Sequence, residues 1–163
     1  MNFVRSSSDD KMMRAGDLVI LGTSHDSADH LWLKAGSLLD NKYGHFTHDD
    51  FIGKPYGSKV RARMGSGWVL ALQPTPELWS CALNTRTQIV NSVDASVIVF
   101  NLDLSPGCIA VESGTGSGSM TMHMAKCVAP NGHVYTYEYN EQRAKAAVIY
   151  AKNMYLLLKC FMH

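Results

Sequence analysis

The residues with the clearest chemical meaning form a glycine-rich segment preceded by an acid, Glu112 to Ser119 (ESGTGSGS). Its three glycines suit a tight turn from a strand into a helix, where the backbone must approach a ligand closely. A phosphate-binding loop of the GxxxxGK(S/T) type would need a lysine after its last glycine, and none follows here. The spacing is GxGxG, whereas nicotinamide dinucleotides favour GxGxxG. The segment therefore predicts a small-molecule site of a different kind.

Two acids accompany the glycines, Glu112 two positions before Gly114 and Glu138 24 positions after it. A carboxylate at 112 would repel a pyrophosphate, but it suits a ligand that carries an ammonium and a sulfonium. An acid at 138, at the end of the next predicted strand, can accept hydrogen bonds from both ribose hydroxyls. The arrangement (D/E)xGxGxG resembles motif I of S-adenosylmethionine (SAM)-dependent methyltransferases, which implies SAM as the cofactor. The alternative, a glycine- and serine-rich surface turn, does not explain the two acids.

The elements that must position these residues alternate between strands and helices. Thr75 can cap a helix that begins at Pro76, because proline is favoured at the first helical position. Strand, helix, strand and helix then imply a βαβ unit with a parallel sheet. The elements predicted from the apolar pattern are a helix at 92–104, a strand at 108–111, a helix at 119–129, a strand at 133–139 and a last helix from 140 or 141.

The end of the chain, from about 147 to 163, is apolar on all sides. We expect a helix there that needs burial, and a sheet that stops after two strands. The edge of 108–112 would then be unpaired, and residues 155–161 would be poorly covered. Exposed apolar surface of this kind favours association or aggregation.

The N-terminal part has a different pattern. Between Asp17 and Leu72, short apolar runs alternate with Gly, Asn, Asp and Ser, which predicts a small β-barrel or meander. The predicted fold class is α/β, a small N-terminal β-barrel followed by the first part of a Rossmann-like methyltransferase domain. The predicted boundaries are 1–14 for a flexible tail, 15–75 for the barrel and 76–163 for a truncated Rossmann-like domain.

The composition is that of a globular protein, 46% hydrophobic and 18% charged, with a net charge of +1. A nucleic-acid site must therefore be a local patch. The sequence shows no secretory signal and no apolar run long enough for a membrane span. The four cysteines form no CxxC pair, and we expect reduced, buried thiols. His45 and His48 have no second ligand pair nearby, so no metal is expected.

A basic stretch in the N-terminal part contains no acid. Such side chains neutralise phosphates, and an aromatic can stack on an unpaired base. A solvated strand face explains the stretch equally well, and the residues alone leave both interpretations open. Trp68 and Trp79 are expected to pack within the protein rather than stack on bases. The members of the stretch are Lys54, Lys59, Arg61 and Arg63, with Tyr56 among them.

Several longer segments resemble one family, the catalytic subunits of tRNA (adenine-N1) methyltransferases that modify adenine 58 in the T loop. They include GDLVIL, YGHFTHDDFIGKPYGSKV, GWVLALQPTPELWSCAL and PGCIAVESGTGSGS, and the resemblance runs from about Gly16 to Ala146. It implies a SAM-dependent enzyme that acts on tRNA and assembles with a non-catalytic paralogous subunit into a heterotetramer. It also implies a nuclear location, otherwise a cytoplasmic one, without secretion.

The resemblance carries over to individual positions. By the motif and the resemblance together, the expected cofactor-binding residues are Val90, Glu112, Gly114, Gly116, Ser117, Gly118, Ser119, Glu138 and Arg143. By the resemblance and the basic stretch, the expected tRNA-binding residues are Lys42, Tyr43, Gly44, His45, Lys54, Lys59, Gly67, Trp68 and Gln88.

The sequence also departs from the family. The Asp that contacts the target adenine, after the fourth strand, has no counterpart, so no catalytic residue is assigned. We expect a chain that is inactive alone, as a truncated splice product or an incomplete gene model would be. One alternative is a non-catalytic RNA-binding or assembly module that binds the partner subunit. Another is a nicotinamide-dependent oxidoreductase, against which the GxGxG spacing and Glu112 count.

Overall fold

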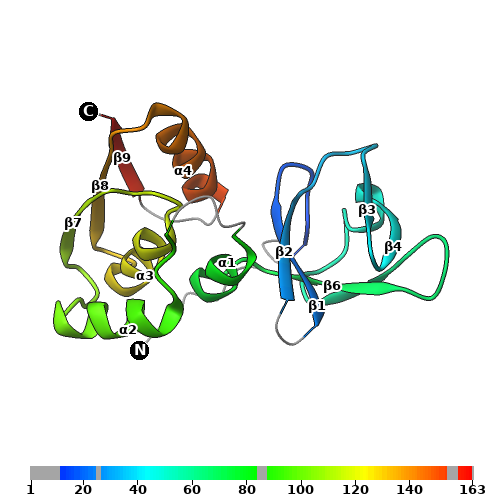
Figure 1. The fold of residues 1–163 in the computed structure, drawn as a ribbon, viewed down its shortest axis with the longest axis horizontal. Coiled ribbons are helices and arrows are strands. Elements are labelled where there is room, and N and C mark those ends of the chain that lie inside the picture. The colour runs from blue at the N-terminus through cyan, green and yellow to red at the C-terminus, as the bar shows by residue number, and fades with distance from the viewer. Residues whose placement is uncertain (1–11, 25–26, 84–87, 154–157, 163) are drawn as a thin grey trace. The chain divides into compact units, whose positions relative to one another are not determined.

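A computed structural model describes residues 12–24, 27–83, 88–153 and 158–162 of the chain (Figure 1). The chain divides into two compact units, Met1–Pro74 and Thr75–His163. In the part that the structure describes, no helix has the length and apolar character needed to cross a membrane. Each unit has its own sheet and its own buried apolar cluster.

The first unit is built from antiparallel strands. Its four-stranded sheet has the order β2-β1-β6-β5, and β3 and β4 form a separate hairpin. The predicted run of short strands is therefore confirmed, but the described pairings form an open sheet and a hairpin, without a closed barrel. The strands are β1 (Leu18–Ser24), β2 (Ser27–Trp32), β3 (Leu38–Asn41), β4 (Gly44–Thr47), β5 (Ser58–Arg61) and β6 (Trp68–Leu72).

Alternating side chains of these strands make the core of the first unit. Val19 and Leu21 of β1 are buried with Val69 of β6, since side chains two apart point to the same face of a strand. Phe46 and Phe51 join them from β4 and from the segment after the short 3-10 helix His48–Asp50, with ring centroids 6.3 Å apart. Tyr43 of the β3–β4 turn is half-buried and packs against this core, whereas Lys42 and His45 beside it are exposed.

The β3–β4 turn packs closely against the residue before β6, and glycines make this close approach possible. A Cβ at Gly67 would lie 1.5 Å from the carbonyl oxygen of Tyr43, so no other residue fits there. Gly44 has φ +129°, and a Cβ there would lie 2.6 Å from Ala62. The amide of Tyr43 donates to the side chain of Asn41 at 2.9 Å, which closes the turn.

The second unit contains a parallel sheet of order β7-β8-β9 with helices between its strands. Thr75 caps the first helix as predicted, because its hydroxyl oxygen accepts the amide of Leu78 at 3.2 Å and Pro76 opens the helix. Ala110, Val134, Met124 and Val128 form the core between sheet and helix. The elements are α1 (Pro76–Ala82), α2 (Ser92–Asn101), β7 (Ile109–Ser113), α3 (Ser119–Val128), β8 (His133–Glu138), α4 (Glu141–Asn153) and β9 (Leu158–Met162).

The expectation of only two strands is wrong. Strand β9 pairs in parallel with β8, from Val134 opposite Leu158 to Glu138 opposite Met162. The last helix expected from 140 or 141 is present as α4, but it ends at Asn153 and residues 158–162 form a strand instead. A short apolar run has no period that separates a buried strand from a buried helix. The open edge is confirmed for β7, since within the described residues it pairs with β8 alone. Residues 155–157 of the segment expected to be poorly covered lie outside the described residues.

Candidate functional site

The glycine-rich segment forms the turn from β7 into α3. Gly114, Gly116 and Gly118 have φ values of +94°, +56° and +78°, in the left-handed region that favours glycine. Around Gly114 and Gly116, no described atom beyond the glycine's own chain neighbours lies within 4 Å of the position that a Cβ would take. The backbone at these two residues therefore borders open space on the side where a side chain would stand.

A pocket of about 560 Å³ lies at the carboxyl ends of β7 and β8. Its size falls in the range of small-molecule sites, and crevices at this end of parallel strands are where α/β folds bind ligands. Its lining residues include four of the predicted cofactor-binding residues. They are Ser113, Gly114, Gly116, Tyr137, Glu138, Tyr139 and Arg143.

Glu138 organises this pocket. Its side chain is 4% exposed; Oε2 accepts the amide of Gly116 at 2.8 Å and Oε1 accepts the amide of Asn140 at 2.9 Å. Nη2 and Nε of Arg143 also donate to Oε1, at 3.0 and 3.2 Å. Burial alone would raise the pKa of Glu138, but the two amides and the guanidinium outweigh it and hold the pKa below its ordinary value. Glu138 is therefore an ionised acceptor at neutral pH.

Glu112 has a different environment from the one the motif predicts. It is not among the described residues that line the pocket. Its Oε2 accepts the hydroxyls of Thr121 on α3 at 2.5 Å and Thr136 on β8 at 2.6 Å. Burial raises the pKa of Glu112 against the opposing effect of these two donors. The carboxylate oxygen thus faces the interior of the unit, between sheet and helix.

The other predicted cofactor residues gather at the start of α3. The hydroxyl of Ser119 donates to the carbonyl of Val90 at 2.7 Å and lies 2.7 Å from the hydroxyl of Ser80 on α1. Gly118 is the cap residue of α3. The carbonyl of Ser117 accepts the indole N–H of Trp79 at 3.4 Å, and Trp79 is fully buried, as predicted for a packing residue.

Sequence reasoning missed Ser113, Tyr137 and Tyr139, which also line the pocket. All three occupy or directly follow the carboxyl ends of the two strands that carry the predicted acids. A parallel sheet brings such ends together, so the position itself was the usable signal.

Most of the predicted tRNA residues meet at the β3–β4 turn. Lys42, Tyr43, Gly44 and His45 form the turn and the start of β4, and Gly67 packs its backbone against Tyr43. The ammonium of Lys42 lies 5.1 Å from the centroid of the Tyr43 ring. His45 Nδ1 lies 2.5 Å from an oxygen of Asp40.

Lys59 and Trp68 form an exposed pair on β5 and β6. The ammonium of Lys59 lies 3.8 Å from the centroid of the Trp68 ring, a cation–π contact. Trp68 is 40% exposed, so the expectation that it packs inside the protein is wrong. Arg61 stands directly opposite Trp68 in the sheet register, at the end of β5.

Two members of the basic stretch are engaged elsewhere. The Nε and Nη2 atoms of Arg63 donate to the two carboxylate oxygens of Asp50 at 2.9 and 3.1 Å. The hydroxyl of Tyr56 donates to the carbonyl of Leu18 at 3.1 Å, and its half-buried ring packs on the core. Lys54 and Gln88 are exposed, the latter in the second unit.

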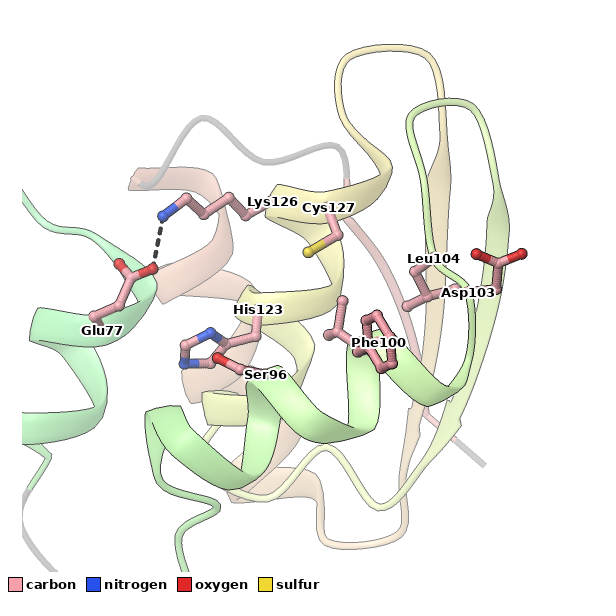
Figure 2. A pocket seen from close by; sticks show the side chains of 9 residues that line it. Glu77, Ser96, Phe100, Asp103, Leu104, His123, Lys126 and Cys127 are labelled. Carbon is pink, nitrogen blue, oxygen red and sulfur yellow. Dashed lines mark hydrogen bonds and ion pairs between the residues drawn. The ribbon is translucent and has the colours of Figure 1, made fainter.

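A second pocket, of about 490 Å³, opens between α1, α2 and α3 and contains none of the predicted residues (Figure 2). Lys126 and Glu77 form an ion pair at 2.6 Å, and Phe100 is 83% exposed. Burial, together with Lys126, lowers the pKa of His123 against the effect of Glu77. The lining residues are Glu77, Ser96, Val99, Phe100, Asp103, Leu104, His123, Lys126 and Cys127.

The prediction of buried cysteines is wrong for those that the structure describes. Cys81, Cys108 and Cys127 are free thiols, and Cys108 and Cys127 are only half-buried. Cys81 is exposed, because it lies on α1 away from the buried face of Trp79 and Ala82. Cys160 lies in β9, outside the residues whose side chains are described. Among the described residues, no group of three or more His, Cys, Asp or Glu side chains is arranged to hold a metal ion.

Two solved structures share this fold. A SAM-dependent O-methyltransferase from Thermotoga maritima is 27% identical, with a TM-score of 0.78, over 94% of this chain and 58% of its own. The tRNA (m1A58) methyltransferase TrmI from Aquifex aeolicus is 25% identical, with a TM-score of 0.68, over 92% of this chain and 58% of its own. The architecture is thus a mixed α/β fold like that of SAM-dependent methyltransferases.

Sequence relatives are closer. The tRNA (adenine(58)-N(1))-methyltransferase catalytic subunit of Dictyostelium discoideum is 42% identical over 84% of this chain and 44% of its own length. The corresponding subunit of Candida albicans is 43% identical over 78% and 38%. The chain therefore spans less than half the length of these relatives. The model of the family described as tRNA methyltransferase complex GCD14 subunit matches residues 67–156, more than half of the chain. The chain belongs to this tRNA methyltransferase subunit family.

Proposed function

We propose that this chain carries the SAM-binding part of a tRNA (adenine-58 N1) methyltransferase catalytic subunit, which methylates adenine N1 in the tRNA T loop. The observation that carries the proposal is the pocket at the carboxyl ends of β7 and β8. There, a buried, ionised Glu138 stands beside two glycines in a chain of this family.

The residues of this pocket fit SAM. A carboxylate has about four lone-pair positions, and Oε2 of Glu138 accepts a single described donor, the Gly116 amide. Glu138 can therefore accept a ribose hydroxyl as well, while Arg143 and Asn140 hold the carboxylate in its orientation. Gly114 and Gly116 leave the space that the rest of the ligand would occupy. When bound, SAM supplies a methyl group carried on a sulfonium.

The exposed turn of the first unit supports a role in tRNA contact. Lys42 and Lys59 are exposed cations that can neutralise phosphates. Trp68 offers a partly exposed ring on which an unpaired base can stack. We propose that this surface, with Tyr43 and His45, contacts tRNA.

Three further proposals rest on family membership. The first unit, whose described pairings form a sheet and a hairpin, closes into a small barrel. A non-catalytic paralogous subunit completes a heterotetramer, which is supported by relatives named as catalytic subunits and by a family named for a complex. The assembly acts in the nucleus.

Calorimetry with S-adenosylhomocysteine and, separately, with NAD tests the cofactor. We expect heat of binding with S-adenosylhomocysteine alone, and a much weaker affinity for it in Glu138→Ala. Glu141→Ala is a matched control, because Glu141 is a nearby exposed acid that pairs with Lys145 on α4. Binding of NAD alone would contradict the proposal.

Transfer of a tritiated methyl group tests the reaction. Unmodified tRNA is the substrate, and the same tRNA with guanine in place of adenine 58 is the control. We expect methylation with the full-length relative and its partner subunit present, and none by this chain alone. Methylation of both tRNAs would contradict the assignment to adenine 58. Binding of tRNA without binding of S-adenosylhomocysteine would favour a non-catalytic RNA-binding module instead.

A further inference from the structure

Glu112, the acid of the glycine motif, belongs to a hydrogen-bonded group with three buried threonines. Thr121, Thr136 and Thr115 are 1%, 1% and 5% exposed. Thr121 belongs to α3, Thr136 to β8, and Thr115 lies inside the glycine loop between Gly114 and Gly116. All three hydroxyls need partners, because an unpaired buried polar group is costly.

The chemistry of the groups fixes the direction of each hydrogen bond. An ionised carboxylate only accepts, so Thr121 and Thr136 both donate to Oε2 of Glu112. A hydroxyl has a single proton, and that of Thr136 is used. Thr115, 2.5 Å from the oxygen of Thr136, must therefore donate to it. The result is a directed chain from the loop through β8 to the end of β7.

We infer that Glu112 is a positioning residue, which shapes the glycine loop through Thr136 and Thr115 and does not contact the ligand's positive charge. This inference rests on the proposed SAM site and assigns the motif acid a different role from the one expected of it. Two observations support it: Oε2 of Glu112 faces the threonines, and the described residues lining the pocket do not include Glu112.

Backbone hydrogen bonds also hold the glycine loop, and the contribution of the threonines comes in addition to them. The amides of Gly114 and Thr115 both donate to the carbonyl of Tyr137, at 2.8 and 3.2 Å, and the amide of Gly118 donates to the carbonyl of Thr115 at 2.8 Å. These bonds hold the two ends of the loop. The Thr115 hydroxyl adds a side-chain hydrogen bond in the middle of the loop, next to the Gly116 amide, which donates to the carboxylate of Glu138.

The first test compares Thr136→Val, which removes the hydroxyl at nearly constant shape, with Thr136→Ser, which keeps it. We expect Thr136→Val to speed amide hydrogen exchange at 114–118 in the ligand-free protein and to weaken S-adenosylhomocysteine binding on the order of tenfold. Thr136→Ser should restore both. Thr121→Val removes one donor from the same carboxylate and should give a smaller change in both, which keeps the test valid if Thr136→Val does not fold. Unchanged exchange and affinity in a folded Val variant would overturn the inference.

The second test separates positioning from charge. Glu112→Gln keeps an acceptor oxygen but removes the charge, so we expect loop exchange near that of the natural protein and S-adenosylhomocysteine affinity within about threefold. If Glu112 instead contacts the ligand's ammonium, Glu112→Gln weakens S-adenosylhomocysteine but spares 5′-methylthioadenosine, which lacks that group; this result overturns the inference. If no protein binds either ligand, the proposed function fails, while the exchange data still decide whether Glu112 and Thr136 hold the loop.

Discussion

The two units hold their candidate ligand-binding residues in opposite ways. In the second unit, Glu138 is buried, and its oxygens accept from two amides and a guanidinium before any ligand arrives. In the first unit, Lys42 and Lys59 are exposed, and their described contacts are with aromatic rings. Buried, hydrogen-bonded charges are costly to disturb, whereas exposed charges are individually weak and screened by salt. We therefore expect single substitutions to weaken ligand binding strongly in the second unit. In the first unit, we expect the loss of binding to be modest and to depend on salt.

Glycine serves the two units differently as well. Gly67 is needed because a neighbouring carbonyl fills the space of a side chain, while Gly116 is needed for its left-handed backbone beside an open pocket. The first requirement concerns folding, and the second concerns a ligand. The following predictions test this contrast, from the largest expected effect to the smallest.

Gly67→Ala should be the most destabilising change. Its Cβ would lie 1.5 Å from the Tyr43 carbonyl, so the β3–β4 turn must move. We expect a loss of about 3 kcal/mol or more in the free energy of unfolding, measured by chemical denaturation. Ser66→Ala, at the exposed neighbouring position, is the control. Equal stability of the two variants would contradict the close contact.

Gly116→Ala should lower the free energy of unfolding by about 1–2 kcal/mol through backbone strain and weaken ligand binding in addition.

Glu138→Ala should have the largest effect on ligand binding. The substitution leaves the Gly116 and Asn140 amides without their acceptor and removes a charged partner of the ligand. We expect S-adenosylhomocysteine affinity to fall about 30-fold, equivalent to about 2 kcal/mol for a charge-assisted hydrogen bond. Calorimetry at low and at high salt should give the same ratio, because the site is buried. A ratio that collapses at high salt would show that Glu138 acts as an exposed charge.

Lys59→Ala should weaken tRNA binding moderately. Loss of one phosphate contact should lower the slope of the logarithm of affinity against the logarithm of salt concentration by about one. Arg63→Ala should leave the slope unchanged, because Arg63 is already paired with Asp50. Fluorescence anisotropy with labelled tRNA measures both, and Lys34→Ala controls for net charge at an exposed position. Equal slopes for Lys59→Ala and Lys34→Ala would show a solvated face without a specific site.

Glu77→Gln should have the smallest effect, although the pKa of Glu77 is lowered from 4.5 to about 2. Burial by itself raises that pKa, but the bonds from Lys126 and from the helix start outweigh it. Both side chains are about half exposed, at 47% and 56%, so the ion pair should contribute less than about 1 kcal/mol near neutral pH. An acid whose pKa is lowered in the folded protein stabilises the fold at pH values above its ordinary pKa. For Glu77, this contribution is lost as the pH falls from about 4.5 toward 2.

Denaturation of the natural protein and of Glu77→Gln should therefore differ near pH 7 and converge at about pH 2. Glu141→Gln is the control, since its i,i+4 pair with Lys145 is fully on the surface. If the difference in stability between the natural protein and Glu77→Gln instead grows as the pH falls, the pKa of Glu77 is raised in the folded protein and the prediction is wrong.

Features encoded by neighbouring residues could be predicted from the sequence. The cap at Thr75, the helix start at Pro76 and the glycine turn at 114–118 depend on bonds or backbone angles within a few residues. The contact between Glu138 and the glycine loop could also be predicted, because consecutive parallel strands end at one edge of a sheet.

Tertiary structure alone decided the rest. Arg63 bonds to Asp50, 13 positions away, and Lys59 lies over Trp68 only because β5 and β6 pair in that register. Glu112 faces Thr136 rather than the pocket because the packing of α3 and β8 places two hydroxyls beside it, 9 and 24 positions along the chain. The apolar ending became a strand because β8 had an open edge for it. Residue types and spacing identify which groups can bond, but the partner that a side chain meets depends on which distant segments the fold brings within a few ångströms.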